Sequence, residues 1–231
     1  LGNANLLIRK YLWRAFLTRR YESQAATRAL QDFRGLRDIL QGDRDASVPI
    51  FDEEQFPLPS VDTLVGARWP KAKDIFAWGV LAVANKAGGR DLADDSRLSG
   101  SNLAGREYHH LFPHDLLTRI GKMEDKEADR ALNCVLLTWN TNRNISAKEP
   151  VRYLEERALR SAMGHEEISR RLVSHLVPWE QLAVGGYEEI ADEADRAGRV
   201  QSDYRSFLEA RAAMMLGPID ALCQGARWEQ V

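Results

Sequence analysis

The chain has 231 residues, of which 44% are hydrophobic and 29% are charged, and its formal net charge is −2. These values indicate a globular protein that is long enough to bury a core, and they exclude a uniformly basic coat for nucleic acid, although not a local basic face. No apolar run reaches the roughly 18 residues that a membrane span needs. Cys134 and Cys223 lie far apart, which excludes a zinc ribbon and favours a reducing, intracellular location.

The N-terminal part begins with a predicted helical hairpin. Apolar residues recur at helical spacing over residues 4–22 and again over residues 23–41. Over residues 1–44 there are nine Lys and Arg against four Asp and Glu, so the hairpin is basic. Residues 45–62 then carry five acids, no bases and three prolines, which predicts an acidic, extended connector.

A third helix is predicted after the connector. Pro70 suits its first position, and Gly88 with Gly89 suits its end. These elements make up an N-terminal helical part over residues 1–89. Because the chain opens on Leu1, almost directly in a helical pattern, we expect a fragment of a longer protein.

The periodicity changes between residues 90 and 160. REYHHLF and NCVLLTW are short and rich in strand-forming residues, and the polar stretch between them is partly helical. Pro150 begins another helix. Further helices are predicted over residues 165–177, 179–184, 187–197 and 199–223, with turns at Gly185-Gly186 and near Gly217-Pro218. The expected fold is mainly α (α+β), with a strand–strand–helix insert at residues 90–160 and a C-terminal helical part at 161–231, and we expect the three parts to form one compact unit.

Three of the five histidines fall in the stretch EYHHLFPH at residues 107–114. His109 and His110 end the first predicted strand, Asn133 begins the second, and Asn142 follows nine residues later in the first turn of a helix. If that helix packs across a hairpin of the two strands, Asn142 faces His109 and His110 points into an open groove. Imidazole titrates near neutral pH and suits a general base, and a divalent cation can stabilise the charge on a phosphorane.

These residues resemble the HNH, or ββα-metal, nucleases, in which a metal ligand and a histidine base precede a proline, an asparagine and a further His or Asn. Here the pattern reads HHLFP, then LNCVLLTW, then NTNRNISAKEP. The resemblance implies that His109 and Asn142 are metal ligands and that His110 is the general base. It also implies that Asn133 holds the loop that carries the base. Many members carry Asp at the position of His109, so this site is less anionic.

The resemblance covers roughly residues 5–185 and extends to the C-terminal nuclease half of GmrSD-type and SspE-type phage-defence restriction proteins. It implies a bacterial, cytoplasmic endonuclease that nicks double-stranded phage DNA. It also implies a separate N-terminal nucleotide-hydrolysing sensor domain, absent from this chain, as a partner. The implied cofactor is one divalent ion, Mg²⁺ or Mn²⁺ first, with Ni²⁺ or Zn²⁺ as further options.

Other charged residues near the motif allow two interpretations. Arg143, Lys148 and Arg152 are either contacts to DNA phosphates or a solvated helix face. His114 and Glu107 are either further metal ligands or ordinary surface and strand residues. The cations of the first helix form a second DNA-facing surface, a solvated face or a contact with the missing domain: Arg9, Lys10, Arg14, Arg19 and Arg20.

Two other functions stay open at this stage. The chain can be a catalytically silent helical module that binds DNA or regulates the sensor domain, in which case His110 has no catalytic task. It can also be an HNH nuclease directed at RNA, which shares the chemistry and differs only in substrate.

Overall fold

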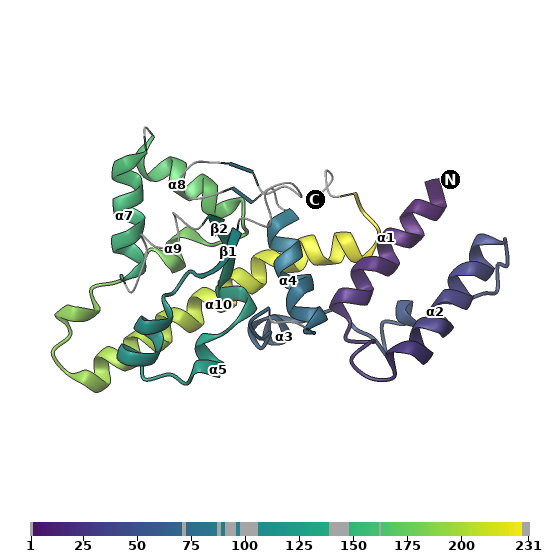
Figure 1. Ribbon diagram of the computed structural model, residues 1–231, viewed down its shortest axis with the longest axis horizontal. Coiled ribbons are helices and arrows are strands. Elements are labelled where there is room, and N and C mark those ends of the chain that lie inside the picture. The colour runs from purple at the N-terminus through teal and green to yellow at the C-terminus, as the bar shows by residue number, and fades with distance from the viewer. Residues whose placement is uncertain are drawn as a thin grey trace.

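In a computed structural model, the chain is mainly helical with one two-stranded antiparallel sheet among the residues described, which are 2–70, 73–86, 89–90, 96–97, 106–138, 148–161 and 163–227 (Figure 1). The α-helices are α1 (Gly2–Leu17), α2 (Ala25–Leu40), α3 (Val61–Val65), α4 (Ile75–Lys86), α5 (Asp125–Ala128), α7 (Pro150–Arg160), α8 (Gly164–Val173), α9 (Trp179–Leu182) and α10 (Glu193–Cys223). Four shorter helical turns are η1 (Pro49–Phe51), η3 (Leu116–Ile120), η4 (Ala131–Asn133) and η5 (Tyr187–Glu189).

The sheet is formed by β1 (Arg106–His110) and β2 (Cys134–Thr138), which pair so that His109 lies opposite Val135 and His110 opposite Cys134. The two strands predicted from the sequence are thus confirmed. Asn133 is the last residue of η4 and directly precedes β2. The segment between the strands is partly helical, as expected, and contains η3 and α5.

The longest helix, α10, runs along the length of the molecule (Figure 1). It packs against α1, α3, η3 and α9, and one face of it is buried. The main hydrophobic core gathers around this face and draws residues from the N-terminal part, the hairpin and the C-terminal helices alike. The three parts that the sequence predicts, divided at residues 89 and 160, therefore share one core. The division itself stays a prediction.

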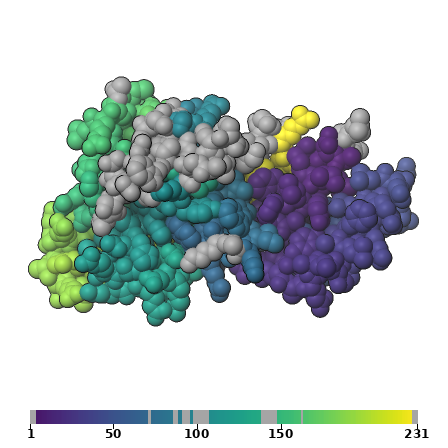
Figure 2. All heavy atoms as spheres, in the orientation of Figure 1, coloured from purple at the N-terminus to yellow at the C-terminus, as the bar shows by residue number. Residues whose placement is uncertain are grey.

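At the N-terminal end, α1 and α2 pack with the acidic connector around a small core of their own. Val48 and Ile50 are almost fully buried there, so the connector is folded against the helices rather than only extended. Gly35 of α2 allows this approach, because a Cβ at that position would lie 2.2 Å from the carbonyl oxygen of Ser47. The space-filling view places these residues, in purple and blue, at one end of the molecule (Figure 2).

Two arginines of the basic hairpin are buried and pair with acidic residues of the chain. Arg14 is fully buried, and its guanidinium donates to the carbonyl oxygens of Ile50 and Phe56 and pairs with Glu53. Arg20 is 3% exposed and pairs with Asp32 at 2.6 Å. A DNA-facing or solvated role is therefore wrong for Arg14 and Arg20, because both side chains lie inside the fold.

Three local predictions are wrong. Helix α4 begins at Ile75 rather than at Pro70, because the side chain of Asp74 accepts a hydrogen bond from the amide of Ala77 and so caps the helix there. The predicted helix at 187–197 is divided into η5 and the start of α10. The turn near Gly217-Pro218 is absent, because Pro218 lies inside α10.

No helix among the described residues combines the length and apolar character that crossing a membrane requires.

Candidate active site at the end of the hairpin

The hairpin directs its two adjacent histidines to opposite faces, because successive side chains of a strand alternate. His109 shares a face with Val135, which belongs to the main core, and it is 6% exposed. His110 shares the other face with Tyr108, and its side chain is 22% exposed. Of the pair, His110 is therefore the histidine with access to solvent.

Two side chains from outside the two strands hold the His110 ring. The indole of Trp69 stacks on it, with ring centroids 3.9 Å apart and an angle of 16° between the planes. Oδ1 of Asp129 lies 3.0 Å from Nε2 of His110. The ring of His114 meets His110 edge-on at 5.5 Å, and His114 itself pairs with Asp125 at 3.2 Å. His110 is thus fixed by a stacked aromatic ring and by a carboxylate beside its Nε2.

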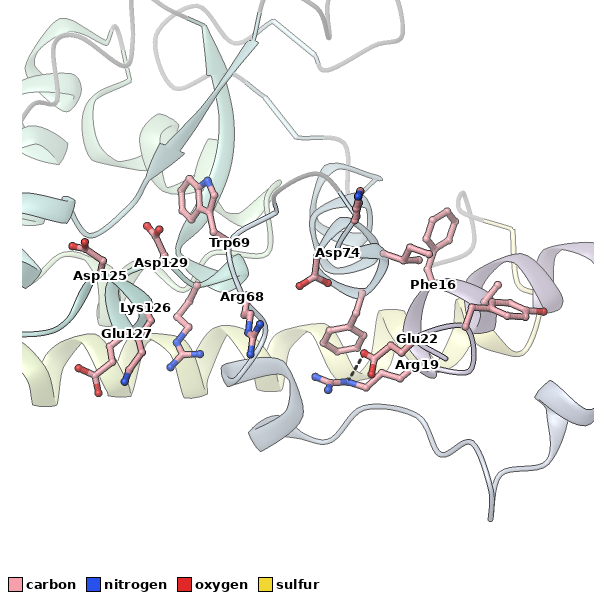
Figure 3. A pocket seen from close by; sticks show the side chains of 16 residues that line it. Phe16, Arg19, Glu22, Arg68, Trp69, Asp74, Asp125, Lys126, Glu127 and Asp129 are labelled. Carbon is pink, nitrogen blue, oxygen red and sulfur yellow. Dashed lines mark ion pairs between the residues drawn. The ribbon is translucent and has the colours of Figure 1, made fainter. Parts of the chain in front are cut away.

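Backbone pairing brings Trp69 and Asp129 together. The amide of Trp69 donates to the carbonyl of Asp129 at 3.0 Å, and the amide of Ala131 donates to the carbonyl of Ala67 at 2.9 Å. The segment before α4 and the segment after α5 therefore form a short antiparallel bridge beside the hairpin. In the close view, Trp69 and Asp129 extend to the same side of this bridge (Figure 3).

The environment sets the protonation and the tautomer of His110. Burial lowers the pKa of His110 from its ordinary value, and the hydrogen bond with Asp129 offsets part of this shift. The neutral imidazole is therefore the main form at pH 7. In that form a carboxylate beside Nε2 favours the tautomer with the proton on Nε2, which leaves the lone pair on Nδ1. The arrangement can serve a general base that acts through Nδ1.

Asn133 fixes the chain just beyond His110. Its buried side chain accepts a hydrogen bond from the amide of Phe112 at 2.8 Å and donates to the carbonyl of Phe112 at 3.0 Å. A third contact reaches the carbonyl of Ala128 at 3.4 Å. One amide side chain thus joins the segment after β1 to the end of α5, next to Asp129. This position suits the loop-holding role that the sequence suggested for Asn133.

Arg211 of α10 binds the backbone on both sides of Asn133. Its guanidinium is buried and donates to the carbonyl oxygens of Leu132 and Cys134, on either side of Asn133. It also donates to the carbonyl oxygens of His175 and Leu176, just after α8. The beginning of β2 is therefore attached to the longest helix of the molecule through a single side chain.

The other predicted site residues have different outcomes. Asn142 and Arg143 lie outside the described residues. Lys148 pairs with Glu156 at 2.6 Å, and Arg152 pairs with Glu188 at 3.1 Å and with Glu149 at 3.6 Å. These internal pairs favour a solvated, salt-bridged face over phosphate contacts for the two described cations.

Asp129 and Trp69 are functional candidates that the sequence pattern did not reveal. Asp129 lies in the polar excursion between the strands, and Trp69 precedes α4, so neither is near the histidines in the chain. The local signal is one of spacing. Asp125 and Asp129 are four residues apart, as are His110 and His114, and each Asp pairs with one of the two histidines.

Comparisons with known proteins add no assignment, because no protein family, no curated protein and no solved structure matches this chain. Among the described residues there is also no group of three or more His, Cys, Asp and Glu side chains that could hold a metal ion. The ligand pair suggested by the sequence, one imidazole and one amide, is smaller than such a group.

Proposed function

We propose that the chain is a metal-dependent HNH endonuclease domain that hydrolyses phosphodiester bonds in DNA and acts as the effector of a phage-defence system. The observation that carries the proposal is the fixed geometry of His110, which is held by Asp129 and Trp69 at the end of an antiparallel hairpin. Asn133 secures the backbone directly behind it. The order of His110 and Asn133 along the chain is the one that the HNH resemblance implies.

In this mechanism Nδ1 of His110 accepts a proton from the water that attacks the phosphorus. Asp129 keeps the Nε2–H bond in place and stabilises the imidazolium that forms, so it acts as a positioning residue. The stacked indole of Trp69 prevents rotation of the ring. Asn133 acts through the backbone of Phe112 and needs no contact with the substrate.

A divalent ion, when bound, supplies stabilisation of the negative charge on the phosphorane and on the leaving oxygen. The resemblance assigns the imidazole of His109, which faces the main core and is 6% exposed, as one ligand. It assigns Asn142, outside the described residues, as the second ligand. A neutral imidazole and an amide oxygen suit Mn²⁺ or Ni²⁺ better than Mg²⁺. With so few protein ligands, a bound ion would keep coordination positions for water and for a phosphate oxygen.

The experiment that tests the proposal is the conversion of supercoiled plasmid to open circle in the presence of Mg²⁺ or Mn²⁺. We expect the wild-type chain to nick and His110→Ala to lose at least about a hundredfold in rate, which is the usual contribution of a general base. His165→Ala is the matched control, because His165 is a histidine on α8, outside the hairpin.

The possible results separate the alternatives. Equal nicking by the wild-type chain and His110→Ala would remove His110 from the mechanism. An absence of nicking with both ions would favour the silent DNA-binding module. Cleavage of single-stranded RNA in place of plasmid would indicate the RNA-directed nuclease.

A further inference from the structure

A hollow of about 990 Å³ lies beside the proposed active site, between the end of α1, the segment before α4 and the region of α5 (Figure 3). Trp69 and Asp129, which hold His110, both line it. Five cationic and five acidic side chains face this hollow, so its formal charge is balanced. The acids and the cations differ in the partners that they have within the fold.

All five acids have partners within the fold. Asp129 and Asp125 pair with His110 and His114, and Glu22 pairs with Arg19. The two others hold helix ends: the carboxylate of Asp74 accepts from the amide of Ala77, and that of Glu127 accepts from the amide of Glu124. The acids of the hollow are therefore engaged in holding the fold.

Two of the five cations are held by carboxylates of the described residues, and three are not. Lys126 pairs with Glu124 and Arg19 with Glu22. In the part of the chain that the structure describes, Arg68 and Lys73 have no ion pair, and the guanidinium of Arg130 donates only to the carbonyl of Gly66. Within the described part of the chain, the charged groups of Arg68, Lys73 and Arg130 are thus not held by a carboxylate.

Arg68 and Arg130 are directly opposite each other in the short antiparallel bridge. The flanking hydrogen bonds, from Trp69 to Asp129 and from Ala131 to Ala67, make this a non-hydrogen-bonded pair, in which opposing side chains lie closest. Two like charges at such positions repel each other. An anion between the two guanidinium groups removes the repulsion, and a phosphate accepts hydrogen bonds from both.

On the basis of the nuclease function proposed above, we infer that Arg68 and Arg130 form a clamp for the phosphodiester backbone of the DNA substrate, with Lys73 beside them. Alternate residues of a strand point to opposite faces, so the two arginines extend away from Trp69 and Asp129, as the close view shows for Arg68 (Figure 3). The clamp therefore contacts a phosphate that flanks the scissile one. It replaces Lys148 and Arg152, whose charges are paired, as the main DNA contact.

The test is equilibrium binding of a fluorescent DNA duplex, measured by anisotropy in EDTA over a series of salt concentrations, so that no cleavage occurs. The double variant Arg68→Gln/Arg130→Gln should bind about tenfold or more weakly at low salt. The slope of log K against log salt should fall by about 1.8, or roughly 0.9 for each phosphate that is no longer neutralised. Arg68→Lys/Arg130→Lys keeps the charge and should retain most of the slope.

The matched control is Arg119→Ala/Arg205→Ala, which removes two exposed arginines outside the hollow and changes the net charge equally. An unchanged slope in the glutamine variant, an equal loss in the control, or no duplex binding by the wild-type chain would each overturn the clamp. This binding assay does not measure cleavage, so it tests the clamp separately from the nuclease function. If the nuclease function alone fails, the chain does not nick plasmid but still binds duplex, and the binding still depends on Arg68 and Arg130.

Discussion

Replacement of Asn133 by alanine should destabilise the protein strongly, because one buried side chain satisfies several backbone groups. The variant leaves the amide and the carbonyl of Phe112 without their partners, which lie at 2.8 and 3.0 Å in the native fold. Each unsatisfied buried group costs about 1–3 kcal/mol. We therefore expect the free energy of unfolding to fall by about 3 kcal/mol, equivalent to a decrease in Tm of about 6–12 °C for a chain of this size.

Urea denaturation followed by circular dichroism measures this loss directly. Asn133→Leu separates hydrogen bonding from packing, since leucine fills the volume and makes none of the hydrogen bonds. Gln201→Ala is a control that removes one amide-to-carbonyl bond, from Gln201 to Gly121 at 2.7 Å in a partly buried site, and should cost about 1 kcal/mol. A loss below about 1 kcal/mol for Asn133→Ala would refute the reasoning, because the freed groups of Phe112 would then have found other partners.

Two further substitutions test the carboxylates of Asp129 and Asp32. Asp129→Asn should lower kcat for nicking at least about tenfold with KM and Tm unchanged. It should have no further effect in a His110→Ala background, because both residues act as one unit, and additive losses would contradict this. Asp32→Ala should cost about 3–5 kcal/mol in urea denaturation, since it leaves the charge of Arg20 buried and unpaired, whereas Asp38→Ala, at an exposed pair, should cost less than about 1 kcal/mol; equal losses for the two variants would contradict the burial argument.

Local sequence patterns predicted the helices well where a single amphipathic face decides the structure, as in α1, α2 and α7. The helix interior at Pro218 was not predictable in this way, because proline lacks the amide that would bond to residue 214. Buried residues on both sides, Met215 and Ile219 among them, keep α10 continuous through that position. Tertiary packing therefore overrides the local signal for a turn.

The candidate site was predictable only in its local part. His109, His110 and Asn133 lie close to strand ends, where short motifs are informative. Asp129 and Trp69 reach His110 through backbone pairing between segments that are distant in the chain, and no periodicity reports such pairing. The burial of Arg14 and Arg20 was not predictable for a similar reason. A basic helical segment has the same sequence pattern whether its cations face solvent or pack against a folded connector.

The contact between α1 and α10 has a consequence for how the chain folds during synthesis. Arg9 and Lys10 of α1 donate to Gly225 and Gln224, just beyond the end of α10. Because the partners in these contacts are separated by 216 and 214 residues, this part of α1 can dock only after α10 has been synthesised. Contacts of such long sequence separation slow folding, so the docking of α1 on the end of α10 is expected to be a late step, after α1 has packed on η1 and α4.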